Sequence, residues 1–274
     1  MKEFLDKISF TIKHLVFIGL FSNVAAGATS EDVPEKYYSP GLKNTHPTNV
    51  YWGDTHLHTN LSLDAYLYGN ARLGPEEAYR FAKGESVKAN NGMLAKLSRP
   101  LDFLVIADHA SNMGLMQGLE ARRKDLLRLP LGKDLAFKLV EINKLSALDK
   151  SSAVILANEL SLDGFSVGKV LDGQRQHDIW KRAALLADQH NDPGHFTAFI
   201  GYEWTQIFYN LHRVVIFKDD SAKAGEIVPF DQYDSSDPEA LWEYLSDYET
   251  QLGGEVLAIP HNGNLSQGVM FALE

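Results

Sequence analysis

The stretch YWGDTHLHTNLSLDA, residues 51–65, decides how this chain is interpreted. Asp54, His56 and His58 are two residues apart, and in a β-strand side chains at this spacing point to one face. Two imidazoles on one face can bind one metal such as zinc, manganese or iron, and Asp54 could bind it too or orient a histidine. Asp64 follows in a polar segment that can return its carboxylate to the same edge.

The composition of the 274-residue chain is that of a globular protein, with 45% hydrophobic and 23% charged residues. The formal net charge of −10 argues against binding to the phosphate backbone of nucleic acids. The chain has no cysteine, which excludes disulfides, thiolate zinc sites and cysteine nucleophiles.

The N-terminus has the pattern of a signal peptide over residues 1–28. Three lysines precede the apolar run HLVFIGLF, and the small residues of NVAAGATS follow it. The run is too short to span a bilayer, so we expect an exported protein, periplasmic or secreted, without a stable membrane anchor. A buried N-terminal helix is the alternative. Residues 29–49 are rich in Pro, Ser, Thr and Asn and are predicted to form an extended lead-in.

Strands and helices are predicted to alternate along the rest of the chain, 50–274. Short apolar runs are typical of buried strands at 101–108, 195–204, 211–217 and 255–260. Helical patterns cover 75–84, 177–190 and 237–254, and residues 115–148 are predicted to form two helices broken near the sequence LPLG. This alternation predicts an α/β fold on parallel strands, with a helical insertion around 111–190.

The predicted strands deliver possible metal ligands at their ends. The first runs into Asp108 and His109, the second ends at Glu203, and the fourth is followed by His261. In β/α barrels the active site lies at the C-terminal ends of the strands. His212 instead begins its strand, and a hairpin between 196–204 and 211–217 would bring it beside Glu203. The set as a whole predicts a metal centre.

Five motifs in order resemble a known family. HLHTNLSLDA, VIADHA, FIGYEW, NLHRVVIF and IPHNGN resemble successive motifs of the PHP (polymerase and histidinol phosphatase) superfamily. The sequences of these motifs most resemble those of the branch called domain-of-unknown-function family 3604, over residues 50–270. The resemblance implies a distorted (β/α)7-type barrel with two or three divalent metal ions, of Zn, Mn, Fe or Mg, that hydrolyses phosphate esters.

The resemblance also assigns the ligands of three metal ions. They are His56 and His58 for the first, Glu203 bridging to a second completed by His212 and His261, and Asp64 with His109 for the third.

The implied reaction is attack on a small phosphorylated or ester substrate by a hydroxide that bridges two metals. Asp108 would support His109 from behind, and Arg213 or Arg72 would clamp the phosphate. Solvated surface arginines are an equally good interpretation of these last two residues.

One departure from the family pattern leads us to expect a truncated chain. The family has a late Asp-x-His that supplies the first and third metals, and none follows His261 before Glu274. We therefore expect a barrel incomplete at its C-terminus, with two metals each short of a ligand and with activity in doubt.

Other interpretations stay open. An amidohydrolase-like enzyme that cleaves amides or esters would share the barrel and the His-x-His start, and a metal-binding fragment without turnover fits the missing ligands. Glu159, which also follows an apolar run, is a rival to Glu203 as the bridging residue. His177, His190 and His195 are expected to be structural or exposed.

Overall fold

The computed structural model describes residues 48–148, 155–157, 169 and 171–271. The chain divides into two units, Met1–Val50 and Tyr51–Glu274, and the fold reported below is that of the second. The predicted signal peptide, nearly all of the predicted lead-in and Glu159 lie outside the described residues. Within the described ranges, no helix combines the length and apolar character that crossing a membrane requires.

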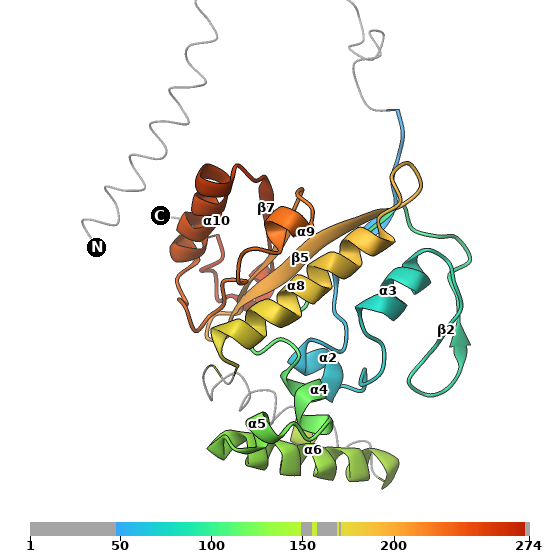
Figure 1. The fold of residues 1–274 in the computed structure, drawn as a ribbon, viewed down its shortest axis with the longest axis vertical. Coiled ribbons are helices and arrows are strands. Elements are labelled where there is room, and N and C mark those ends of the chain that lie inside the picture. The colour runs from blue at the N-terminus through green and yellow to red at the C-terminus, as the bar shows by residue number, and fades with distance from the viewer. Residues whose placement is uncertain (1–47, 149–154, 158–168, 170, 272–274) are drawn as a thin grey trace, which may run out of the picture. The chain divides into compact units, whose positions relative to one another are not determined.

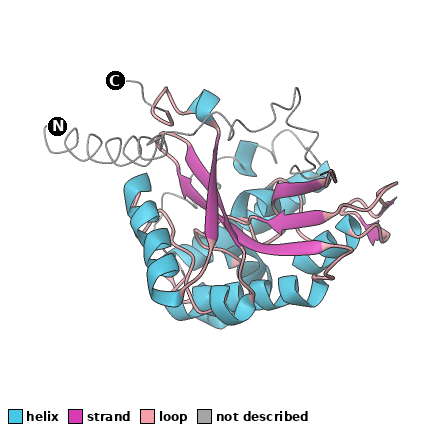
Figure 2. Ribbon diagram, turned by 90° about the horizontal axis from the view of Figure 1, so that it is seen from above, coloured by secondary structure: helices cyan, strands magenta, loops and turns pink. Residues whose placement is uncertain are grey.

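A mixed sheet of five strands in the order β1-β4-β5-β6-β7 forms the centre of this unit. The first three are parallel, and β6 is antiparallel to both of its neighbours, so β7 again runs in the direction of β5. The sheet curls into an open half-barrel (Figure 2). The structure therefore confirms a mixed α/β fold with a curled five-stranded sheet, but not the expected seven-stranded barrel. The strands are β1 (Gly53–Leu57), β4 (Phe103–Ile106), β5 (Thr197–Gln206), β6 (Leu211–Phe217) and β7 (Val256–His261).

The four predicted strands are all present, but the prediction of a parallel sheet is only partly right. β5 and β6 form the predicted hairpin, in which Thr205 pairs with His212. The connection is short, and Asn210 turns the chain with a positive φ of 53°. Two strands joined this closely can only be antiparallel, because a parallel connection needs a dozen or more residues. A separate small ribbon pairs β2 (Val87–Lys88) with β3 (Leu94–Ala95).

Helices cover the outer face of the sheet. Figure 1 shows α8 (Gly173–His190) lying along β5, and its Trp180 packs with Tyr202 and Phe217 of the sheet. Alternation along β5 and β6 places these aromatic residues on the outer face and the intervening residues on the inner face. The main core therefore lies between sheet and helices, while a smaller apolar cluster that includes Val105 and Val214 lines the inner face.

The helices begin and end at recognisable signals. Asp172 caps α8 through Arg175 N, and Asp237 caps α10 through Glu239 N. Residues 115–148 form three helices rather than the predicted two, and the last begins at Pro130 because proline is well suited to a first helical turn. The helices are α2 (Leu63–Leu67), α3 (Pro75–Ala82), α4 (Leu115–Glu120), α5 (Lys124–Leu127), α6 (Pro130–Leu148), α8 (Gly173–His190), α9 (Ser221–Ala224), α10 (Pro238–Leu252) and the 3-10 turn Gly263–Leu265.

Replacement of Trp180 by alanine tests this arrangement of the core. Trp180 is 1% exposed, and its indole N–H donates to the carbonyl of Ala224 at 2.7 Å. We expect Trp180→Ala to lower the free energy of unfolding by about 3–5 kcal/mol, measured by chemical denaturation. Trp52, which is 61% exposed, supplies the matched control. Trp52→Ala should change the free energy of unfolding by less than about 0.5 kcal/mol. Equal losses in the two variants would contradict this core.

Candidate metal centre

One edge of the sheet collects the predicted ligands. The C-terminal ends of β1, β4, β5 and β7 meet there with the N-terminal end of β6, because β6 runs in the opposite direction. His212 pairs directly with His261 across β6 and β7, and His109 pairs with Glu203 in an isolated bridge beyond β4. Strand direction alone thus brings His56 and His261, which are 205 residues apart, to one edge.

Glu203 is the centre of the cluster and is 1% exposed. Its Oε2 lies 2.8 Å from Nε2 of His56 and 2.8 Å from Nε2 of His58. Its Oε1 contacts Nδ1 of His212, lies 3.1 Å from Nε2 of His261 and lies 3.7 Å from Nδ1 of His109. The two oxygens of one carboxylate therefore face two separate sets of imidazoles.

The electrostatic surroundings keep Glu203 ionised. Burial by itself would raise the pKa of this carboxyl group. The charge of His109 and the hydrogen bonds from His212, His261 and His56 outweigh burial and hold the pKa far below its usual range. A carboxylate in this state is an acceptor on both oxygens, which is the form that binds metal.

The donor set fits divalent metal ions. Two overlapping groups have ligand atoms within 4.8 Å of one another, His56 with Glu203 and His261, and His58 with His109 and Glu203. Nε2 of His56 and Nε2 of His58 also lie only 3.0 Å apart while both face the same oxygen. When both rings lack a hydrogen at Nε2, these two nitrogens and the oxygen present lone pairs to one point, where a cation could bind them. Neutral imidazole and carboxylate are the ligands of zinc, manganese and iron, so these buried groups could hold such an ion.

Asp64 and His109 form a second pair at the rim. Asp64 Oδ2 lies 3.4 Å from Nε2 of His109. Burial would raise the pKa of Asp64, but the hydrogen bond and charge of His109 lower it to about 2. Burial would lower the pKa of His109, but the charges of Glu203 and Asp64 raise it to about 9. Without a metal, His109 is therefore an imidazolium between two carboxylates.

Asp108 is buried beneath the cluster, and it was predicted to support His109 from behind. Its carboxylate accepts from Thr59 N and Oγ1, both at 2.6 Å, and from Ser62 Oγ at 2.9 Å. Ser62 Oγ in turn accepts from the backbone N–H of His109 at 3.0 Å. Burial raises the pKa of Asp108 against the lowering by these hydrogen bonds and by His58.

The structure does not bring the two candidate arginine clamps to the cluster. Arg213 alternates with His212 along β6 and so points to the outer face, where it lies over Trp242 and contacts Sδ of Met270. Arg213 is 5% exposed, which packing against α10 explains. Arg72 has an exposed side chain on the loop before α3.

The remaining predicted polar residues lie apart from Glu203. Asp54 is exposed and accepts the backbone N–H of His56 at 2.8 Å, so it shapes β1 and lies outside the two ligand groups. His190 pairs with Glu76, His177 contacts the carbonyl of Gly225, and His195 is 81% exposed.

Three hydroxyl residues of the site were missed by the sequence analysis. Thr205 Oγ1 lies 2.6 Å from Nδ1 of His109, and Ser62 and Thr59 join Asp108 to the cluster. Thr205 is two residues after Glu203 on a strand, so the period of two places it on the inner face and would have indicated it. Ser62 and Thr59 lie in a turn before α2, where no periodicity indicates direction.

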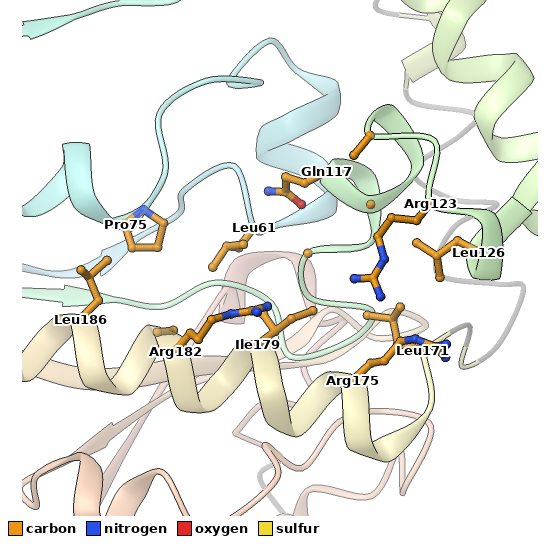
Figure 3. Close-up of a pocket in the computed structure, with 14 residues that line it drawn as sticks. Leu61, Pro75, Gln117, Arg123, Leu126, Leu171, Arg175, Ile179, Arg182 and Leu186 are labelled. Atoms are coloured by element: carbon orange, nitrogen blue, oxygen red, sulfur yellow. The ribbon is translucent and has the colours of Figure 1, made fainter.

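An open pocket of about 380 Å³ lies between α4, α5 and α8 (Figure 3). Apolar side chains such as Leu61 and Ile179 line it, together with three arginines. Two of these, Arg123 and Arg175, pair with Asp125. None of the predicted metal ligands lines this pocket, so it is separate from the centre.

A comparison with protein families matches most of the chain. The profile of the family described as "Protein of unknown function (DUF3604)" matches residues 45–274. The chain belongs to this family. The match includes every residue of the cluster around Glu203. No curated protein and no solved structure matches the chain.

His109 gives the metal-free chain a pH-dependent stability. Its pKa is about 9 in the folded chain and about 6.5 when unfolded, so its contribution is complete below pH 6.5 and is lost as the pH rises through 9. His212, whose pKa burial lowers, titrates below this window. We expect the free energy of unfolding in chelator to fall by roughly 3 kcal/mol from pH 6.5 to 9.

Urea denaturation at several pH values measures this slope. His109→Gln should abolish the slope, while His195→Gln, at an exposed histidine, should retain it. A native chain with equal stability at pH 6.5 and 9 would contradict the proximity of His109 to the two carboxylates.

Proposed function

We propose that this member of the DUF3604 family is a metal-dependent hydrolase of phosphate esters, of the PHP type that its motifs resemble. One observation carries the proposal: the buried carboxylate of Glu203 presents one oxygen to His56 and His58 and the other to His212 and His261. A carboxylate whose two oxygens face different pairs of histidines is suited to bridge two metal ions.

These contacts support the grouping of ligands that the resemblance implies. His56 and His58 would hold one ion with Oε2 of Glu203, and His212 and His261 would hold a second with Oε1. Asp64 and His109 would hold a third at the rim. When bound, divalent ions would lower the pKa of water and neutralise charge on a phosphoryl group.

The exposure of the cluster gives the direction from which substrate enters. The side chains of His56 and Asp64 are 35% and 32% exposed, whereas those of Glu203 and His109 are 1% and 6% exposed. A small substrate would therefore approach from the side of β1 and α2. His56 and Asp64 would lie nearest to it, and Glu203 would stay shielded from water.

Residues 1–28, which lie outside the described residues, favour export, so we place this hydrolase in the periplasm or outside the cell. Its substrate would be a small phosphorylated compound, and the acidic balance of the chain speaks against a nucleic acid.

Glu203→Gln tests the metal centre. The amide keeps the size of the side chain but removes its negative charge and one acceptor. We expect bound metal, counted by mass spectrometry, to fall by at least one ion per chain. Hydrolysis of p-nitrophenyl phosphate should fall more than about 100-fold. Glu226→Gln, on an exposed residue paired with Lys181, is the matched control and should change neither quantity.

Chelation supplies a second test, because a metal that binds only the folded chain stabilises it. We expect EDTA to lower the melting temperature and added Zn²⁺ or Mn²⁺ to restore it. A chain that binds metal but cleaves no phosphate ester would favour a metal-binding role. Cleavage of lactones or amides instead would favour the amidohydrolase alternative.

A third test concerns the alternative that the chain is a serine hydrolase. The sequence GFSVG at 164–168 has the Gly-x-Ser-x-Gly pattern of such enzymes. These residues lie outside the described part of the chain. Ser166→Ala should leave phosphatase activity unchanged if the metal centre carries the reaction. Loss of activity in this variant with full metal content would overturn the proposal.

A further inference from the structure

Ser62 lies where three hydrogen bonds meet beneath the metal centre. Its hydroxyl is fully buried and lies 2.9 Å from Asp108 Oδ1, 3.0 Å from the backbone nitrogen of His109 and 2.8 Å from Nδ1 of His58. A serine hydroxyl has one hydrogen to donate and two lone pairs that accept. With three partners, the role of every atom in this group is constrained.

The hydrogens can be assigned one at a time. The backbone N–H of His109 can only donate, so it takes one lone pair of Ser62. Asp108 Oδ1 already accepts the backbone N–H of Thr59, so this oxygen acts as an acceptor and takes the single hydrogen of Ser62. One lone pair remains, and Nδ1 of His58 must therefore carry a hydrogen and donate it to Ser62.

The opposite nitrogen of His58 is the one that faces the cluster. Nε2 lies 2.8 Å from Oε2 of Glu203 and 3.0 Å from Nε2 of His56. A neutral imidazole that is protonated at Nδ1 has a bare lone pair at Nε2, which is the form that binds metal. The wrong tautomer would direct an N–H at the ion.

We infer that Ser62 is a positioning residue: with Asp108 behind it, its hydroxyl holds His58 in the tautomer that presents a bare Nε2 to the metal centre. Thr59 completes the device, since its N–H donates to Oδ1 and its hydroxyl to Oδ2 of Asp108. Thr59, Ser62 and Asp108 are at most 2% exposed, so water does not compete for these bonds. The consequence for metal binding rests on the proposed function, whereas the tautomer itself does not.

The tautomer is measured directly by long-range ¹H–¹⁵N correlation spectra of the ¹⁵N-histidine-labelled full chain, with and without Zn²⁺. The resonances of His58 are assigned from the spectrum of His58→Gln. We expect Nδ1 of His58 to carry the hydrogen in the native chain and Nε2 to shift when Zn²⁺ is added. In Ser62→Ala the acceptor is lost, so the metal-free chain should shift toward hydrogen on Nε2. Zn²⁺ affinity should fall about 10- to 100-fold.

Two variants separate this role from a general effect on folding. Ser62→Thr keeps the hydroxyl and should restore both the native tautomer and the Zn²⁺ affinity. Ser111→Ala is the matched control, because Ser111 is 2% exposed and its hydroxyl has no hydrogen-bond partner among the described residues. It should retain both properties of the native chain.

The possible outcomes are distinct. Hydrogen on Nε2 of His58 in the native chain would overturn the inference, even if Ser62→Ala fails to fold. Unchanged spectra and affinity in Ser62→Ala would also overturn it. A native chain that shows the expected tautomer but binds no Zn²⁺ would overturn the proposed function and leave the positioning of His58 supported.

Discussion

The contact on which the functional edge of this protein depends is that between the buried carboxylate of Glu203 and the imidazoles around it. Five histidines lie within 4 Å of its two oxygens. A buried carboxylate is costly unless opposite charge or hydrogen bonds compensate, and here every compensating group is a possible metal ligand. The interactions that make Glu203 tolerable in the fold are therefore the same ones that would bind divalent ions.

The reversed direction of β6 completes this arrangement. His212 is the second residue of a seven-residue strand. If β6 were parallel to β5, that position would lie at the opposite edge of the sheet, roughly 15–20 Å away at about 3.3 Å per residue. The β5–β6 hairpin instead pairs His212 with Thr205, two residues from Glu203. A tight turn is thus a requirement of the site as much as of the fold.

The sequence indicated Glu203 and the histidines that cluster around it, but not the hydroxyl residues that contact them. The strand ends at Glu203 and His261 were visible because apolar runs stop at polar residues, and the resemblance supplied their grouping. Arg213 was a candidate phosphate clamp beside His212, but alternation along a strand sends adjacent side chains to opposite faces. The partners of Asp108 could not be predicted, because the turn at 59–62 has no periodicity that fixes where its hydroxyls point.

The outer face of the sheet carries most of the apolar core, whereas one edge of the sheet carries the cluster around Glu203. In this core Trp180 and Trp204 are at most 1% exposed, and the core holds the strands in register. The edge with the histidines contributes little apolar burial. Without metal, it gathers five imidazoles around the one carboxylate of Glu203. Such an edge stays ordered because the core on the other face fixes the backbone from which its side chains project. This division explains how a cluster that is electrostatically demanding can still keep the arrangement in which a metal ion could bind.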